Sequence, residues 1–218
     1  MPGQLVVLLV VVVVAGVFWW YQHHSTQQRR RDLAAVAAAR GWRFSVDDVG
    51  ILASHEGWFE LFGQGHSKRV GNVLVGTTAT GHPCYLFDYR YVTGSGRNRT
   101  THLRTAVLVE HGHRSWPHLE LSREGFFSRI GDALGFPDVT FESDEFNRTW
   151  EVRCRDARFA HALIDPAMMQ HLLGQSDELL VELRGGWALH YERGRVAAVS
   201  MPDLLTRLSD FLARVPPV

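Results

Sequence analysis

The segment Leu5 to Tyr21 carries no charged side chain, and it constrains the chain more than any other feature. As a helix its 17 residues extend about 26 Å, close to the ~30 Å hydrocarbon thickness of a bilayer. Its many valines do not prevent a helix in lipid, where only a helix satisfies its own backbone hydrogen bonds. Trp19, Trp20 and Tyr21 close the segment, as aromatic residues do at a membrane interface. The sequence therefore predicts a single-pass transmembrane anchor over residues 1–24.

A cleaved signal peptide is the alternative interpretation of this segment. Such a peptide begins with positive charge and ends at small residues where cleavage occurs. Residues 1–4 carry no charged side chain, and three bulky aromatics followed by Gln22 occupy the place of a cleavage site. The uncleaved anchor is therefore favoured.

The charge on either side of the anchor predicts its orientation. No Lys or Arg precedes the segment, whereas Arg29, Arg30 and Arg31 follow it closely. By the positive-inside rule the remainder of the chain lies in the cytoplasm, and these arginines belong to the predicted membrane interface. Cys84 and Cys154 are expected to be small buried hydrophobes, and a disulfide between them is the alternative if the domain is exported.

Residues 25–41 are predicted to form a juxtamembrane helix or linker, ended by Gly41. Residues 42–218 are predicted to form one soluble α+β domain, with a subdivision near residue 122 as an alternative. Its strands are expected to be antiparallel, because short loops connect them and parallel pairing would need crossovers. The predicted strands are residues 73–78, 83–92, 102–110, 119–121, 150–154, 179–183 and 187–191.

Helices are expected to pack against this sheet. Ser122 is predicted to cap a helix that bears Phe126, Ile130 and Leu134 on one side. Two short helices follow, divided at Asp165–Pro166, and a last helix begins after Ser200. The polar, glycine-rich residues 63–69 are expected to form an exposed loop.

Three groups of residues carry a resemblance to a known family. They are Arg40-Gly-Trp-Arg43, then Asn72-Val-Leu-Val-Gly76 leading into Phe87-Asp-Tyr89, and Asp144-Glu-Phe-Asn-Arg148 with Leu163-Ile-Asp-Pro-Ala-Met-Met169. Together they resemble a family of actinobacterial membrane-anchored proteins of unknown function. The resemblance covers most of the chain and implies a bacterial origin, an anchor and a single soluble domain. It implies no catalytic residues.

The composition excludes some classes of function. Lys plus Arg and Asp plus Glu each number 23, so no net field attracts nucleic acid. The sequence contains no phosphate-binding loop, no nucleophile elbow and no paired-histidine metalloprotease motif. We therefore expect no cofactor and assign no catalytic residue.

Three groups of residues remain as site candidates. His111, His113 and His118 lie close together in sequence with Glu120 nearby, which is how some metal sites begin; exposed loop histidines are the alternative. Arginines at positions 90, 97, 99 and 104 surround one hairpin and could meet anionic headgroups. Asp88 lies on an otherwise apolar strand, where a structural ion pair with an arginine is favoured over a role as a general base.

These features favour a non-enzymatic interaction or scaffolding module at the membrane surface. Its expected partners are the lipid bilayer and an unidentified protein, with no nucleic acid. Two alternatives come from other classes: a membrane-anchored metal-dependent hydrolase that uses the His111–His118 region, and a small-ligand or lipid-binding domain. The second alternative requires an apolar cavity between sheet and helices.

Overall fold

The structure is a computed structural model that describes residues 2–112, 115–125, 137–175 and 179–215. Within α1 (Pro2–Ala39), the side chains of residues 2–12, 14–15, 17–19 and 21–23 also lie outside the description. Predictions that concern Phe126, Ile130, Leu134 and His113 fall on residues that are not described.

The described elements after α1 alternate between strands and short helices. The strands are β1 (Arg43–Asp47), β2 (His66–Thr77), β3 (Pro83–Thr93), β4 (Thr100–Glu110), β5 (Leu119–Arg123), β6 (Trp150–Cys154), β7 (Val181–Arg184) and β8 (Trp187–Arg193). The helices are α2 (Ile51–His55), α3 (Glu60–Gly63), α4 (Asp144–Thr149), α5 (Ala157–Leu163), α6 (Pro166–Leu173) and α7 (Met201–Leu212), with 3-10 turns η1 (Gly96–Asn98) and η3 (Ala198–Ser200).

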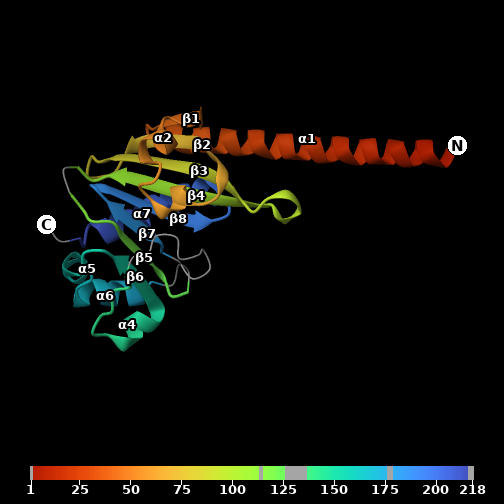
Figure 1. Cartoon of the computed structure of the whole chain (residues 1–218). Coiled ribbons are helices and arrows are strands. Elements are labelled where there is room, and N and C mark those ends of the chain that lie inside the picture. The colour runs from red at the N-terminus through yellow and green to blue at the C-terminus, as the bar shows by residue number, and fades with distance from the viewer. Residues whose placement is uncertain (1, 113–114, 126–136, 176–178, 216–218) are drawn as a thin grey trace.

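All eight described strands belong to one sheet in the order β1-β2-β3-β4-β8-β7-β5-β6, and every described pair is antiparallel. The first four strands form a meander: α2 and α3 lie between β1 and β2, a short turn at residues 78–82 joins β2 to β3, and η1 lies between β3 and β4. The β7–β8 hairpin then separates β4 from β5, so the second half of the chain extends the same sheet (Figure 1). The predicted α+β class with antiparallel sheet and packed helices is confirmed.

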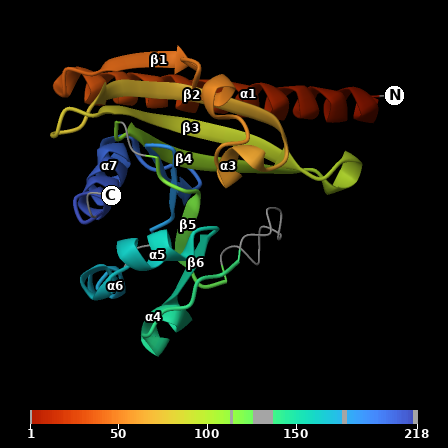
Figure 2. The same ribbon diagram turned by 60° about the vertical axis from the view of Figure 1, so that its left-hand side comes forward.

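Hydrophobic cores lie on both faces of the sheet. One core combines alternate residues of β3 and β4 with α5, α6, α7 and the end of α1, where Leu33 and Ala37 are 0% and 1% exposed. The other core lies under α2 and α3 and is rich in aromatic residues, among them Phe59, Phe62 and Tyr89. Figure 2 shows α7 and α3 near the central strands, with α4, α5 and α6 gathered around β6.

Helix α1 is joined to the domain without an interruption. Its C-terminal part contacts β1 and β2, and it ends where Gly41 adopts a left-handed φ of 67°. Its N-terminal part projects away from the domain on the same side as the end of the β3–β4 hairpin (Figure 1). Among the side chains that the structure describes, no helix combines the length and apolarity needed to cross a membrane.

Several local expectations are confirmed and two are wrong. Trp150, Val152 and Cys154 alternate as the buried side of β6, and Asp165 caps α6 by accepting from the Met168 N–H. Ser122 does not cap a helix, because it lies inside β5 and is 1% exposed. Residues 66–69 are not loop. They begin β2, at an end of the sheet that extends past the core, where strands need no apolar alternation.

Candidate functional sites

A histidine and two glutamates meet on β5 and β7. Glu120 and Glu182 are paired directly across the two strands, and His118 lies two residues before Glu120, on the same face. His118 Nε2 is 3.4 Å from Glu120 Oε1 and 3.8 Å from Glu182 Oε2. We call His118, Glu120 and Glu182 the His–Glu cluster.

Helix α3 fixes the carboxylate of Glu182. The backbone N–H of Glu60 donates to Glu182 Oε2 at 2.6 Å, and the N–H of Leu61 donates to Oε1 at 3.2 Å. Both donors are at the start of α3, where backbone N–H groups have no partner within the helix. The Glu182 side chain, which is 0% exposed, is therefore held in one orientation.

The side chains of the cluster are shielded from water, and this burial shifts their pKa values. Burial raises the pKa of Glu120 and of Glu182, and for Glu120 the neighbouring charge of Glu182 raises it further. Burial also raises the pKa of Glu60 to about 6, with a smaller contribution from Glu182. Burial lowers the pKa of His118, partly offset by Glu120.

Basic side chains border the cluster on β6. Arg153 is the cross-strand neighbour of Glu120, and it lowers the pKa of that carboxyl. Its guanidinium bonds to two other carboxylates, with Nε 3.1 Å from Asp138 Oδ1 and Nη2 2.7 Å from Glu151 Oε1. The positive charge beside Glu120 is thus shared with Asp138 and Glu151.

The histidines proposed from sequence occupy different surroundings. His118 belongs to the His–Glu cluster. His111 stacks on His82 with ring centroids 4.3 Å apart, and its ring also lies against Trp116 at 5.4 Å. Among the described residues, the metal-compatible group around His118 includes Glu120 and Glu182 but not His111.

Sequence reasoning missed Glu182 as a partner of Glu120. The two are 62 positions apart in the sequence, and only the β5–β7 pairing brings them together. One signal was present: Glu182 is the single charged residue within the otherwise apolar run Leu179–Leu183. A carboxylate is rarely buried in such a run without a compensating partner.

A second polar site connects α1 to the sheet. Arg29 Nε and Nη2 donate to the two carboxylate oxygens of Asp88 on β3 at 2.8 and 2.6 Å, and Arg29 Nη1 donates to the Val196 carbonyl at 2.8 Å. Asn72 Nδ2 donates to Asp88 at 2.8 Å. Asn72 lies at an irregularity of β2 with a positive φ of 53°, which turns its amide toward β3. We call Arg29, Asn72 and Asp88 the α1 seat.

The α1 seat confirms the arginine partner predicted for Asp88. Arg29 was also predicted to belong to the membrane interface, and the structure shows its side chain 12% exposed within the seat. Trp20 is 61% exposed, and Arg31 is exposed as well. The side chains of Trp19 and Tyr21 lie outside the described residues, so the interface itself stays a prediction.

A cleft of about 370 Å³ opens between α2 and the sheet. Four of its lining residues are aromatic rings: His55, Trp58, Tyr85 and Trp187. The His55 and Trp187 rings meet edge to face at 4.5 Å, and Trp58 is 37% exposed. The cleft also contains Glu110 and Ser54, so it offers both ring faces and polar groups to a ligand.

Comparison with known proteins gives one informative similarity. No family model and no curated protein matches the chain. Among solved structures, the chain is similar to the mycobacterial trehalose monomycolate transport factor A, TtfA, with a TM-score of 0.59 and 13% sequence identity. The similarity covers 87% of this chain and 97% of that one. At this identity it shows a shared fold. The similar structure is from an actinobacterium, as is the family that the sequence resembles. The agreement concerns the group of bacteria and not the family itself.

Proposed function

We propose that the chain is a non-enzymatic accessory protein of lipid transport, anchored in the cell membrane by the Leu5–Tyr21 part of α1. Its α+β domain would lie in the cytoplasm and bind a protein partner at the membrane surface. The observation that carries the proposal is the α1 seat, because it joins to the folded domain the helix whose first part has the apolar Leu5–Tyr21 sequence. The name of the similar mycobacterial structure, a transport factor, supports the association with transport.

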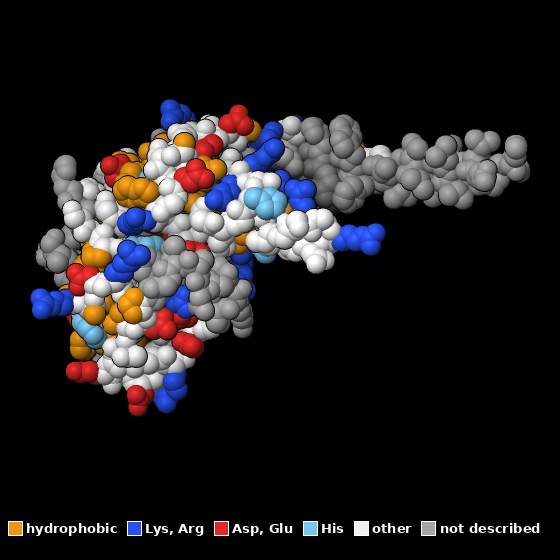
Figure 3. Space-filling model, in the orientation of Figure 1, with side chains coloured by type: hydrophobic (Ala, Val, Ile, Leu, Met, Phe, Trp, Pro, Cys, Tyr) orange, Lys and Arg blue, Asp and Glu red, His pale blue; other side chains and the backbone are white. Residues whose placement is uncertain are grey.

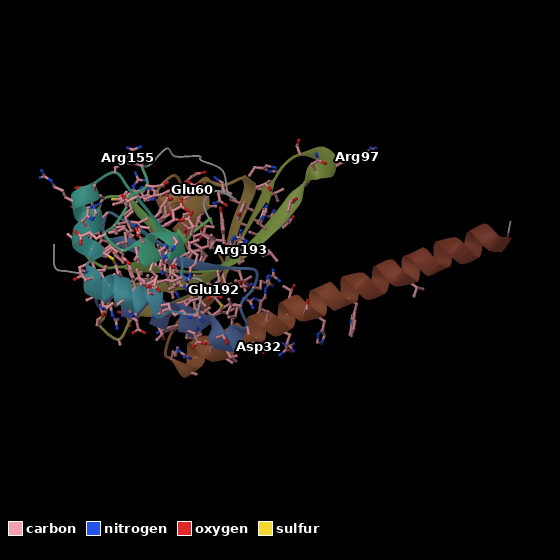
Figure 4. All side chains as sticks on the ribbon, turned by 90° about the horizontal axis from the view of Figure 1, so that it is seen from below. Asp32, Glu60, Arg97, Arg155, Glu192 and Arg193 are labelled. Carbon is pink, nitrogen blue, oxygen red and sulfur yellow. The ribbon has the colours of Figure 1, made fainter. Side chains whose placement is uncertain are left out.

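The β3–β4 hairpin adds a second contact with the membrane in this proposal. From Asp88 to Thr93, β3 advances about 17 Å, which equals about 11 residues of helix. Counted along α1 from Arg29, the end of the hairpin reaches about the height of residue 18, which is the height of the predicted aromatic interface. Arg97 lies at this end in Figure 4, and Arg99 follows it; both are exposed.

The charge of this end of the molecule suits an anionic surface. No acidic residue occurs between Thr93 and Arg104, and Figure 3 shows Lys and Arg side chains gathered near the base of α1 and at the end of the hairpin. Each such basic residue contributes about 1 kcal/mol near anionic lipids. The arginines at positions 97 and 99 would therefore hold the hairpin against headgroups while α1 supplies the anchor.

The anchor is tested by placing charge in the apolar segment. Full-length protein should stay in the membrane fraction after carbonate extraction, and the double variant V10R/V13R should be released. Each arginine at the centre of a span opposes insertion by about 2.5–3.5 kcal/mol. The matched variant V10L/V13L should remain in the membrane. Extraction of the unmodified protein by carbonate would contradict the anchor.

Sidedness and transport need separate tests. For sidedness, two reporters are fused separately to the C-terminus, one active only in the cytoplasm and one active only after export. The cytoplasmic reporter should be active, and activity of the exported reporter alone would contradict the orientation.

The transport role is tested in a deletion strain. This strain should retain newly made glycolipid in the inner membrane, and full-length protein should restore its export while V10R/V13R should not. Unchanged glycolipid export after deletion would contradict the transport role.

A second candidate function is the binding of a small amphiphile in the aromatic cleft. The cleft is lined by the exposed ring of Trp58 and by Val49, which is 39% exposed, and these apolar groups favour this alternative. Aromatic faces and a few polar groups are typical of ligand sites. Addition of a trehalose glycolipid should then change the tryptophan fluorescence of the protein but not that of W58F, whereas an equal response in both would argue against the cleft.

A further inference from the structure

We propose that His118, Glu120 and Glu182 form a binding site for a divalent transition metal ion such as Zn²⁺. Each residue offers one ligand atom, and these atoms all lie within 4.8 Å of one another. The site is independent of the membrane anchor. It lies on β5 and β7, and strands β4 and β8 separate these from β3 of the α1 seat.

The spacing of the ligand atoms fits a tetrahedral ion. With metal–ligand bonds of about 2.0–2.1 Å, neighbouring ligand atoms around such an ion lie roughly 3.3–3.4 Å apart. His118 Nε2 is 3.4 Å from Glu120 Oε1 and 3.8 Å from Glu182 Oε2. Three protein ligands leave a fourth position for water.

Glu120 gives an independent indication of a ligand. Its side chain is 3% exposed, and its Oε1 atom accepts no hydrogen bond from any residue that the structure describes. A buried acceptor left in this way carries an uncompensated desolvation cost. The Oε1 atom is also the Glu120 oxygen nearest His118, so an ion between them would satisfy it.

The pairing of Glu120 with Glu182 points to a cation for a second reason. The two carboxylates are direct cross-strand neighbours, and like charges in that arrangement destabilise a sheet. Arg153 beside Glu120 offsets part of this repulsion, but its guanidinium also bonds to Asp138 and Glu151. A divalent ion would neutralise both carboxylates at once.

The surroundings determine the type of metal. Two backbone N–H groups of α3 orient Glu182, as outer hydrogen bonds orient metal-bound carboxylates. One imidazole nitrogen with two carboxylates suits Zn²⁺, Mn²⁺ or Fe²⁺, whereas Ca²⁺ and Mg²⁺ prefer oxygen ligands alone. We therefore expect Zn²⁺ or Co²⁺ to bind and Mg²⁺ not to compete at similar concentration.

The test is metal binding by the full-length protein in detergent. After removal of metal with a chelator, the protein should take up one equivalent of Zn²⁺ by equilibrium dialysis. Co²⁺ should produce the visible absorption of a tetrahedral site. The variants E120Q and E182Q should bind at least about tenfold more weakly, since loss of even an outer partner of a metal ligand costs 10–100-fold.

Two variants serve as matched controls. H111Q and E142Q alter a histidine outside the cluster and an exposed glutamate, and both should bind one equivalent unchanged. E120Q keeps the shape of the side chain and removes one of two repelling charges, so it should fold. Absence of Zn²⁺ uptake by the unmodified protein at about 100 micromolar free metal would overturn the proposal. Undiminished uptake by both E120Q and E182Q would overturn it as well.

Discussion

Arg29 of α1 and Asp88 of β3, 59 residues apart in the sequence, form two parallel hydrogen bonds between one guanidinium and one carboxylate. Asn72 bonds to the same carboxylate, and the carbonyl of Val196 accepts from the remaining Arg29 amino group. Four segments distant in sequence therefore meet at one ion pair. Because Asp88 is 8% exposed, the pair cannot be broken without leaving a charge in a largely apolar place.

The first prediction concerns this pair. R29A and D88A should each lower the free energy of unfolding by about 3 kcal/mol, because each leaves a mostly buried charge without its partner. The double variant should lose little more than either single variant. R29K should retain part of the stability, since one ammonium cannot form two parallel bonds. Denaturant unfolding of the full-length protein in detergent measures these differences.

R148A is a suitable control for the first prediction, because Arg148 is exposed on α4, away from α1. It should change stability by no more than about 0.5 kcal/mol. Additive losses in the double variant would show that Arg29 and Asp88 contribute separately.

The second prediction concerns pH and His190. Complete burial lowers the pKa of His190 from 6.5 to about 4, and the ring is held by a 2.7 Å hydrogen bond from Nδ1 to the Leu180 carbonyl. Between these pH values the unfolded chain takes up a proton that the folded chain does not. The free energy of unfolding is therefore at its full value above pH 6.5, and it falls by about 3 kcal/mol as the pH falls from 6.5 toward 4.

H190Q should remove this loss, so the difference in stability between it and the unmodified protein should change with pH across that window. The carboxyls of the His–Glu cluster titrate in both proteins and cancel in the comparison. H161Q, which alters an exposed histidine of α5, should follow the unmodified protein at every pH. A constant difference between H190Q and the unmodified protein from pH 4 to 7 would contradict the burial effect.

The third prediction concerns the contact between Trp42 and Gly76. A Cβ atom at Gly76 would lie 2.3 Å from the Trp42 ring, so the ring packs directly over the backbone of β2. G76A should lower the free energy of unfolding by about 1–3 kcal/mol, because the ring must move. In a W42A background the same substitution should cost nothing or stabilise slightly, since Ala suits a strand better than Gly.

The fourth prediction concerns the hairpin. A fluorescent label at S95C should be more shielded in nanodiscs with anionic lipid than in neutral nanodiscs. R97Q/R99Q should abolish that difference, because two arginines contribute about 2 kcal/mol, or roughly thirtyfold, to headgroup contact. R148Q should not change it. Equal shielding in neutral and anionic nanodiscs would contradict the contact.

Local features of the fold were predictable from sequence because local rules determine them. The alternation of Trp150, Val152 and Cys154 predicted β6, and Asp165 before Pro166 predicted the start of α6. Ser122 was wrongly predicted as a cap, because a serine before an apolar run suits a cap and a strand equally, and pairing with Glu151 decided the outcome. Strand pairing is a property of the whole sheet.

The sites were predictable only in part, for the same reason. The apolar surroundings of Asp88 indicated an arginine, but twenty-two arginines were available, and only the packing of α1 selects Arg29. Residues from the sequence groups that resemble the actinobacterial family meet in pairs, Trp42 with Gly76 and Asn72 with Asp88. Glu182 was missed because its partner lies on a strand that only the fold places beside it.

The continuity of α1 determines how the domain could reach a partner. A flexible linker would let a tethered domain search a volume, and its encounters would depend on an effective concentration set by linker length. The helix instead continues without a break from Tyr21 to Arg29, so the arm between the predicted interface and the α1 seat is rigid and about 12 Å long. Because Arg29 is bonded to Asp88, the domain keeps a fixed distance and orientation relative to that arm. The position of a partner relative to the membrane would therefore select it as much as the chemistry of its surface.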